Sequence, residues 1–374
     1  MKHLVFASAL ASVVVLPGVP APREEPRTVA PAKAEPLDCF ARRTRKLTDR
    51  VWVIERPNPT DAPFEGNTTV IELDRSLVVV DAGGSRAAGE SIVREIRALS
   101  RKPVGTLVYT HYHGDHNLGA VALRDAWPDM AIVSTERTRE HMTGAPMDYV
   151  RSYAKSYGEM AAFALRQSRD ESVSASERAG WARFAAAGPC MESGYTDPVV
   201  VPAQVTFSER YTIHDASMQV EVLFLGRANT DGDALVWLPG QRVLVTGDVV
   251  VHPIPYASAC HPGEWCTVLE RVKGFDFAFL VPGHGAVQTD RAYVDTLLEA
   301  LREIRGRVGE LAGRGMELDE VRRTVDLKSV RARFVGDEDG WGRVLFANLF
   351  LEAIVANAWR EARGEPIVQG REGG

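Results

Sequence analysis

The sequence predicts an α/β fold made of two halves that are each rich in β-strands. Apolar runs of strand length occur at Leu77–Val80 and Val104–Tyr109 in the first half, and at Met218–Phe224 and Val243–Thr246 in the second. Ala87–Leu99, between the first two runs, carries apolar residues at helical spacing. This order of strand, helix and strand is typical of parallel strands, and open α/β sheets bind ligands at the carboxyl ends of such strands.

The N-terminal residues have the composition of an export signal. Lys2 and His3 precede an apolar run, Leu4–Leu16, and small residues follow in Pro17–Ala21. We therefore expect a signal peptide at residues 1–21 and an exported protein, periplasmic or secreted. The run is short for a bilayer and no later segment is apolar for long enough, so we expect no integral membrane segment. Residues 22–36, with repeated Pro, Ala, Arg and Glu, predict a disordered linker.

The other elements follow from residue patterns and turn signals. Alternating or β-branched residues predict antiparallel strands, and helical spacing predicts helices. In the first half these are strands at Leu47–Glu55 and Asn67–Leu73, helices at Leu118–Ala126 and Thr135–Met142, and a short strand at Ala131–Ser134. In the second half the strands are Thr206–Ile213, Met218–Phe224, Leu235–Leu238, Val243–Thr246 and Phe275–Val281.

Two helical regions are predicted outside this strand pattern. Residues at about 146–190 are rich in Ala, Ser, Arg, Glu and Met and predict an insertion, either a lid over a site or a layer that completes the core. Amphipathic helices at Arg291–Leu311, Glu317–Val325 and Trp341–Trp359 predict a helical extension, residues 291–374, packed on a domain of residues 37–290. The wide apolar stripe of Trp341–Trp359 favours a core position, with a homodimer interface as the alternative.

The charge distribution disfavours nucleic acid as a partner. The net charge is -6, and Lys and Arg are scattered except in Arg42–Lys46, a run that we interpret as a solvated surface.

Four cysteines allow three pairings in an exported chain. Cys260 and Cys266 flank His261–Trp265 and are close enough in sequence to close a small loop, which leaves Cys39 and Cys190 to pair across the fold. Free buried thiols are the alternative, and both are favoured over metal ligands.

Thr110–His116 is the stretch on which the prediction of function depends. Three histidines and an aspartate, His111, His113, Asp115 and His116, lie within it directly after a predicted strand. Imidazole and carboxylate suit Zn²⁺, with Fe or Mn as alternatives. The alternation of a strand places His111 and His113 on one side, whereas the last two residues fall in the turn that follows. The spacing therefore predicts two neighbouring metal positions.

This motif resembles the HxHxDH signature of the metallo-β-lactamase superfamily, and the resemblance extends from about Asn67 to Ala286. Five segments occur in the family's order: Val78–Gly83, Thr110–His116, Gly226–Asp233, Thr246–Asp248 and Pro282–Gly285. The resemblance implies a four-layer αββα sandwich with a helical insertion and C-terminal helices.

The resemblance also implies two sets of ligands. The second position would have Asp115, His116, Asp248 and His284, and the first would have His111, His113 and a shared, bridging Asp248. One residue departs from the family: Asn229 stands where a third histidine is usual, and an amide oxygen is a weak ligand for Zn²⁺ or none. We therefore expect the second position to fill first.

The function that follows is metal-dependent hydrolysis. One or two zinc ions would lower the pKa of a bound water, supply hydroxide and polarise a small ester, lactone, lactam or related substrate. Asp115 and Asp248 would be catalytic as well as ligands. We expect Asp81 and Asp233 either to bond to ligand side chains on the side away from the metal or to stabilise turns. His252 could compensate for Asn229 or contact substrate, and the alternative is an ordinary surface or hydrogen-bonded histidine. The alternative is a catalytically impaired metal-binding or accessory protein of the same fold.

Overall fold

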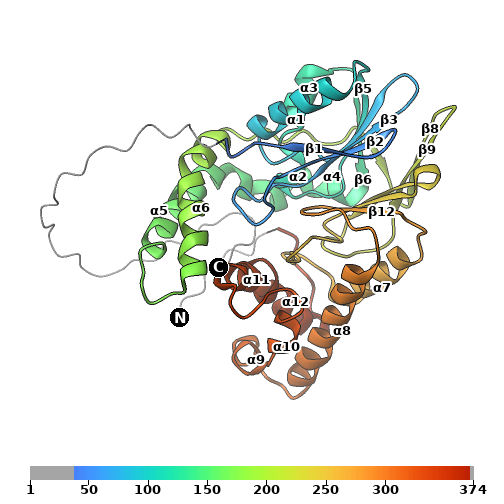
Figure 1. The fold of residues 1–374 in the computed structure, drawn as a ribbon. Helices are drawn as coiled ribbons and strands as arrows, with labels where there is room; N and C mark the ends of the chain where they lie inside the picture. Colours follow the sequence, from blue (N-terminus) through green and yellow to red (C-terminus); the bar gives the residue numbers. More distant parts are fainter. Residues whose placement is uncertain (1–37, 371–374) are drawn as a thin grey trace, which may run out of the picture.

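Two facing β-sheets with helices on their outer sides form the body of the protein. The structure is a computed structural model that describes residues 38–370, so the predicted signal peptide and linker lie outside the described residues. One sheet has the strand order β1-β2-β3-β4-β5-β6-β7 and the other β12-β11-β10-β9-β8. Figure 1 shows α1 and α3 on the outside of the first sheet and α7 and α8 beside the second. The predicted αββα sandwich is confirmed.

The first sheet combines an antiparallel meander with parallel strands. β1 to β4 pair antiparallel, whereas β4, β5, β6 and β7 pair parallel. The strands are β1 (Arg43–Thr48), β2 (Val51–Glu55), β3 (Thr68–Glu72), β4 (Leu77–Val80), β5 (Val104–Val108), β6 (Ala131–Thr135) and β7 (Val205–Phe207).

In the second sheet, only β11 and β12 are parallel. Its strands are β8 (Arg210–His214), β9 (Gln219–Phe224), β10 (Ala234–Leu238), β11 (Val243–Gly247) and β12 (Phe279–Pro282).

The alternation of side chains along each strand separates two hydrophobic cores. In β4, Val78 and Val80 belong to the core between the sheets, whereas Leu77 and Val79 belong to the core under the helices. All four are buried because both faces of this strand are covered. This explains why the strand is a continuous apolar run instead of an alternating one.

Helices of the first half cover the outer face of the first sheet and lead into the insertion. They are α1 (Arg86–Leu99), α2 (Gly114–Asn117), α3 (Ala120–Ala126) and α4 (Glu136–Met142). The region between β6 and β7 contains a 3-10 helix, η1 (Ala145–Ser152), and an antiparallel pair, α5 (Tyr153–Gln167) and α6 (Ala175–Gly194), which projects to one side in Figure 1.

The C-terminal half of the chain adds a helical layer. Its elements are the 3-10 turn η2 (Pro239–Gln241) and the helices α7 (Pro262–Lys273), α8 (Ala292–Gly313), α9 (Leu318–Thr324), α10 (Lys328–Arg331), α11 (Gly340–Phe346) and α12 (Glu352–Arg363). A π-helical turn, η3 (Ala347–Leu351), joins α11 to α12. The predicted helix at Trp341–Trp359 is thus helical throughout. Its stripe, including Phe346, Phe350 and Ile354, is buried in the core of the monomer.

Several predicted strands differ in extent from the observed ones. Thr206–Ile213 is not one strand, because a bend at Ser208–Glu209 passes the chain from β7 in the first sheet to β8 in the second. Leu47–Glu55 is similarly divided by a turn at residues 49–50 into parts of β1 and β2. Phe275–Val281 forms a strand only from Phe279, since the preceding residues follow the end of α7, a helix that the sequence did not reveal.

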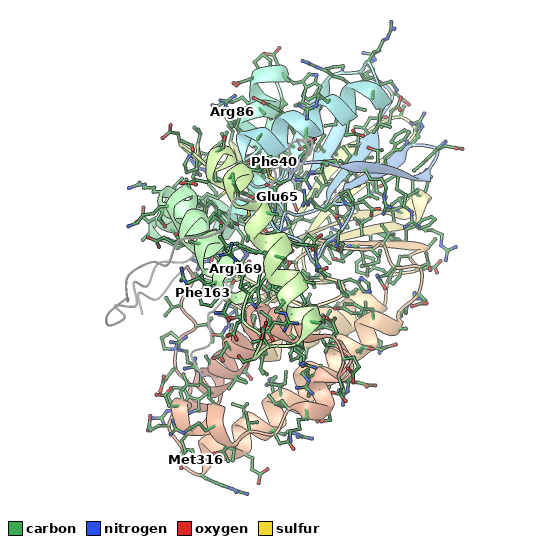
Figure 2. All side chains as sticks on the ribbon, turned by 60° about the vertical axis from the view of Figure 1, so that its left-hand side comes forward. Phe40, Glu65, Arg86, Phe163, Arg169 and Met316 are labelled. Atoms are coloured by element: carbon green, nitrogen blue, oxygen red, sulfur yellow. A yellow bond between two sulfur atoms is a disulfide. The ribbon has the colours of Figure 1, made fainter. Side chains whose placement is uncertain are left out.

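The interpretation of Arg42–Lys46 as a solvated surface is wrong for Arg42. Its side chain is fully buried and forms an ion pair with Glu65, which is buried equally completely. Glu65 also accepts a hydrogen bond of 2.6 Å from Tyr195, and Tyr195 packs against Phe40. Phe40 and Glu65 lie next to α6 in Figure 2. The basic run therefore connects the start of the domain to the helical insertion.

A disulfide links Cys39 to Cys190 of α6, as one of the predicted pairings requires. The Cys260–Cys266 pair is wrong, because both are buried free thiols. Cys266 lies within α7, whereas the sulfur of Cys260 lies 3.5 Å from the amide nitrogen of Asn357 on α12. Helix formation from Pro262 thus takes the place of the small disulfide loop.

Across residues 38–370, none of the helices has both the length and the apolar character that crossing a bilayer demands.

The disulfide should stabilise the attachment of the insertion. It closes a sequence separation of 151 residues, and removal of a native disulfide typically costs about 2–4 kcal/mol, mainly through the entropy of the unfolded chain. We expect the double variant Cys39→Ser/Cys190→Ser to melt several degrees below the wild type in thermal unfolding. A reductant should lower the melting temperature of the wild type and of the control Cys266→Ser, but not that of the double variant. A wild-type melting curve that does not respond to reductant would contradict this expectation.

Candidate metal centre

The candidate ligands meet at one edge of the sandwich, where four strands end. Asp81 follows β4, His111 follows β5, Asp248 follows β11 and His284 follows β12 closely. Because β4 and β5 are parallel, and β11 and β12 are parallel, these carboxyl ends share an edge. The two sheets thus bring together residues that are between 137 and 203 positions apart in the sequence.

The first group of side chains comprises His111, His113 and Asp248, whose donor atoms lie within 4.8 Å of one another. His111 Nε2 is 3.0 Å from His113 Nδ1 and 3.7 Å from Asp248 Oδ2. All three side chains are buried. This is the arrangement that the alternation of His111 and His113 predicted.

The second group comprises Asp115, His116 and His284, with the same 4.8 Å limit. His116 Nε2 is 3.1 Å from His284 Nε2, which is 3.1 Å from Asp115 Oδ2. The Asp115 side chain is 18% exposed, whereas the two histidines are almost fully buried. Asp115 is therefore the member of this group that faces solvent.

Asp248 contacts both groups with different oxygens. Its Oδ2 faces His111, and its Oδ1 lies 3.2 Å from His116 Nε2 and 3.5 Å from His284 Nε2. Oδ1 is buried without a hydrogen-bond partner among the described residues. The carboxylate thus lies between the two groups, in the position that a bridging ligand would need.

Two glycines make room for these side chains. A Cβ atom at Gly283 would lie 2.0 Å from Asp248 Oδ1, and one at Gly66 would lie 2.5 Å from the ring of His116. Both distances are shorter than any side chain tolerates. Glycine at each position therefore allows a ligand to occupy the space between backbone segments.

Asp81 lies behind the ligands and orients two of the imidazoles. Its Oδ2 is 2.8 Å from His116 Nδ1 and accepts a 2.7 Å hydrogen bond from Thr110 Oγ1, which in turn lies 3.0 Å from His111 Nδ1. The Thr110 backbone N–H also donates to Oδ1. With their Nδ1 atoms occupied in this way, His111 and His116 both present Nε2 to the centre.

The side chain of Asn229, at the position where the sequence motif would lead one to expect a third histidine, lies beside Asp248. Its amide nitrogen is 3.4 Å from Asp248 Oδ2, and its Oδ1 is buried without a partner among residues 38–370. Asp233 holds the turn that carries it, because the carboxylate accepts hydrogen bonds from the N–H groups of Ala228 and Thr230 and from the Thr230 hydroxyl. All the described hydrogen bonds of Asp233 are with this turn and none is with an imidazole.

Burial and neighbouring charges set the protonation of the site. Burial, with the neighbouring histidines, holds the pKa of His111 well below its usual value, and burial also lowers the pKa of His113. Burial alone would raise the pKa of Asp115, but His116 and His284 hold it below its usual range. The first group therefore has neutral imidazoles with free lone pairs, and Asp115 is ionised.

The donor set fits a divalent cation. Two pairs of imidazole nitrogens face each other at 3.0 and 3.1 Å, and an unpartnered carboxylate oxygen lies between the groups. Two nitrogen lone pairs that face each other repel, and this repulsion becomes an attraction when a cation or a proton lies between them. Histidine and carboxylate ligands suit Zn²⁺, and also Fe²⁺ and Mn²⁺.

Other histidines lie outside these groups. His252 packs its ring 4.8 Å from that of Tyr293, and its backbone N–H donates to the carbonyl of His284. His141 pairs with Asp231 at 2.6 Å. The Nε2 atom of His261 lies 3.2 Å from the amide nitrogen of Gln369. His252 thus supports the His284 loop through its backbone, and contact with substrate stays a prediction.

Sequence reasoning missed several residues that contact the ligands or the backbone next to them. Asn67 joins the two halves, because its side chain donates to the carbonyls of Pro282 and Gly285 beside His284. The ring of Tyr256 lies 4.7 Å from that of His284, and Ser258 Oγ lies 3.3 Å from His113 Nε2. These are single residues in loops, and no spacing rule links them to the motif.

The family follows from this geometry and from comparison with known proteins. The model of the metallo-beta-lactamase superfamily matches residues 61–312, about two thirds of the chain. The chain belongs to the metallo-beta-lactamase superfamily. By their names, the curated relatives that it matches include an alkylsulfatase, a thioesterase and beta-lactamases.

Individual relatives are distant. The chain is 24% identical over 269 residues to a linear primary-alkylsulfatase of Pseudomonas sp. (strain ATCC 19151), covering 69% of this chain and 49% of that protein. It is 20% identical over 264 residues to a type 2 metallo-beta-lactamase of Bacillus cereus, covering 69% and 81%. The solved sec-alkylsulfatase Pisa1 from Pseudomonas sp. aligns with a TM-score of 0.58 and 16% identity, covering 85% of this chain and 50% of that one.

The chain spans between about a quarter and just over half the length of the first three curated relatives that it matches. At these identities, the structural likeness shows the fold alone.

Asp233 should make the stability of the protein depend on pH. Burial raises its pKa to about 7, whereas the same group titrates near ~3.9 in an unfolded chain. The folded state therefore holds a proton that the unfolded state releases, so this contribution is complete below about pH 4 and is lost as the pH rises through about 7.

Asp233→Asn cannot ionise. Its amide oxygen can still accept from the Ala228 and Thr230 N–H groups, and its NH₂ group can donate to the Thr230 hydroxyl, which accepts instead of donating. We expect the difference in unfolding free energy between the variant and the wild type to shift in favour of the variant as the pH rises from 5 to 8, by about 2 kcal/mol or more. Thermal unfolding of both proteins across that range measures this difference. The comparison between the two proteins cancels the titration of the ligands. A difference in melting temperature that stays constant with pH would refute the assignment.

Proposed function

We propose that the protein is a zinc-dependent hydrolase that acts on a small ester, lactone, lactam or related substrate. The observation that carries this proposal is the pair of His and Asp groups joined by Asp248. The first group would be held by His111, His113 and Asp248, and the second by Asp115, His116, His284 and the same Asp248. A bound divalent cation supplies a water nucleophile at neutral pH and polarises the substrate oxygen.

The chain's own residues would orient the reactants. Asp115 is ionised and partly exposed, so its carboxylate can accept a hydrogen bond from water at the mouth of the site. Its lowered pKa makes it a weak base, which favours an orienting role over storage of a proton. Asp81 and Thr110 fix the imidazoles of His116 and His111 and so limit their rotation while substrate binds.

Export of the protein is also a proposal. The N-terminal sequence has the pattern of a secretory signal, and the Cys39–Cys190 disulfide supports an oxidising compartment.

Metal content and turnover test the proposal together. Purified mature protein should contain one or two zinc ions per chain by elemental analysis. The Asp248→Ala variant should lose most of the metal, and any hydrolytic rate should fall at least 100-fold, because both groups lose a ligand. The panel should contain chromogenic carboxylic esters, lactones, β-lactams and, given the alkylsulfatase relative, alkyl sulfates. Asp170→Ala, in the exposed loop between α5 and α6, is the matched control. Absence of both bound metal and turnover would refute the proposal.

Asn229 supports a second candidate, a metal-binding protein with impaired catalysis, and a single substitution distinguishes the two. Asn229→His supplies the imidazole that the family usually has beside the first group. If the protein is an enzyme, we expect higher occupancy of the first group and a changed rate on the substrates that the wild type hydrolyses. Higher occupancy without any turnover in either protein would favour the impaired candidate.

A further inference from the structure

Each of three ligand imidazoles has a described polar partner on the nitrogen that faces away from the centre. Thr110 Oγ1 is the partner of His111, and Asp81 Oδ2 is the partner of His116. For His113, whose Nδ1 faces His111, the remote atom is Nε2, and Ser258 Oγ lies 3.3 Å from it. The first two partners follow the neighbouring strands β5 and β4. Ser258 comes from a different part of the chain, the loop between β11 and α7.

The loop that carries Ser258 is anchored on the C-terminal helical layer. The N–H of Ala257 donates to the carbonyl of Leu349 at 3.0 Å. Leu349 lies in the π-helical turn η3, where the wider hydrogen-bond pattern of a π-turn interrupts the α-helical one and frees carbonyl groups for other partners. The irregular turn thus has a specific contact with the loop at the metal centre.

Asn357, on α12, is a second anchor for the same loop. Its amide nitrogen lies 3.5 Å from the carbonyl of Ala257, 3.4 Å from that of Ser258 and 3.5 Å from the sulfur of Cys260. Asn357 is 3% exposed, so these contacts are shielded from water. A buried amide that faces three acceptors on one loop fixes the path of that loop more strongly than apolar packing does.

We propose that Ser258 positions His113 for metal binding in the first group, and that Asn357 of the C-terminal helix fixes Ser258 in turn. The hydroxyl accepts a hydrogen bond from the Nε2–H of His113, which selects the tautomer with a free lone pair on Nδ1. The C-terminal helical layer thereby sets the metal affinity of the group in which Asn229 has replaced an imidazole. This inference rests on the proposed metal site but not on turnover of any substrate.

Two isosteric variants test the role of the hydroxyl. Ser258→Thr keeps it, whereas Ser258→Val has nearly the same shape without it. To observe each group alone, both changes are made in a His284→Ala background, which retains the first group, and in a His111→Ala background, which retains the second. The affinity for Zn²⁺ is measured by competition with a chromophoric chelator, and Co²⁺ absorption reports the geometry of the ligands.

Partners of this kind typically contribute about 10- to 100-fold to metal affinity. We expect Ser258→Val to weaken Zn²⁺ binding about 10-fold in the His284→Ala background and to change the Co²⁺ spectrum, while Ser258→Thr stays within about 2-fold of Ser258. In the His111→Ala background both variants should bind as their parent does. Equal affinities of the Thr and Val variants in the first group would overturn the proposal.

The anchor has its own matched control. In the His284→Ala background, Asn357→Ala should lower the affinity of the first group for Zn²⁺, but by less than Ser258→Val does. Asn348→Ala removes a buried amide of the preceding turn η3, whose nitrogen donates to the carbonyl of Val344 and has no other described partner within residues 38–370, and it should leave the affinity for Zn²⁺ unchanged. Equal losses in the two Asn variants would show a general effect of helix destabilisation and would overturn the role of Asn357. Absence of metal from the parent proteins would refute the proposed metal site itself, which is a different result.

Discussion

The structure depends on a set of like donor atoms that converge at one buried edge. Imidazole nitrogens that face each other at 3.0 and 3.1 Å, with the Asp248 carboxylate between the pairs, would repel one another without a cation or protons among them. The surrounding fold opposes this repulsion through hydrogen bonds to the ring nitrogens that point away from the centre. Asp81 does so for His116 directly and for His111 through Thr110. Folding without metal and binding of metal are therefore linked, since each ligand is held at a cost that the ion offsets.

The same edge explains why two separate sheets are needed. One sheet supplies Asp81 and His111 at the ends of β4 and β5, and the other supplies Asp248 and His284 after β11 and β12. Asn67 connects them, because its amide donates to carbonyls on both sides of Gly283 and His284. A small shift of one sheet relative to the other would separate Asp248 from one of its two groups. The packed hydrophobic core between the sheets, which is rich in valine, restricts such a shift.

The sequence predicted the parts of the protein whose information is local. Apolar runs and helical spacing located most strands and helices, and the ligands from His111 to His284 lie in short segments with recognisable residues. The division of Thr206–Ile213 was not predictable, because a strand pattern does not show that the chain changes sheets at Ser208. Helix α7 was hidden by Pro262 and by two cysteines that suggested a disulfide loop. The contacts of Ser258, Asn357 and Asn67 depend on tertiary packing of distant segments, which residue periodicity does not encode.

The insertion of η1, α5 and α6 forms, together with α4, the connection between β6 and β7, which are neighbouring parallel strands. A connection of this kind has to return to the opposite end of the sheet, but its length is not set by any strand pairing. Its length can therefore change during evolution while the register of the strands stays the same. For protein engineering, a replacement of the helical pair would leave the strand pairing intact, but it would have to preserve the contact of the insertion with the metal-binding motif, where the Tyr149 hydroxyl accepts a hydrogen bond from the Gly114 backbone N–H. Cys39, Arg42 and Glu65, which hold α6 from outside the insertion, mark the contacts that a replacement must reproduce or dispense with.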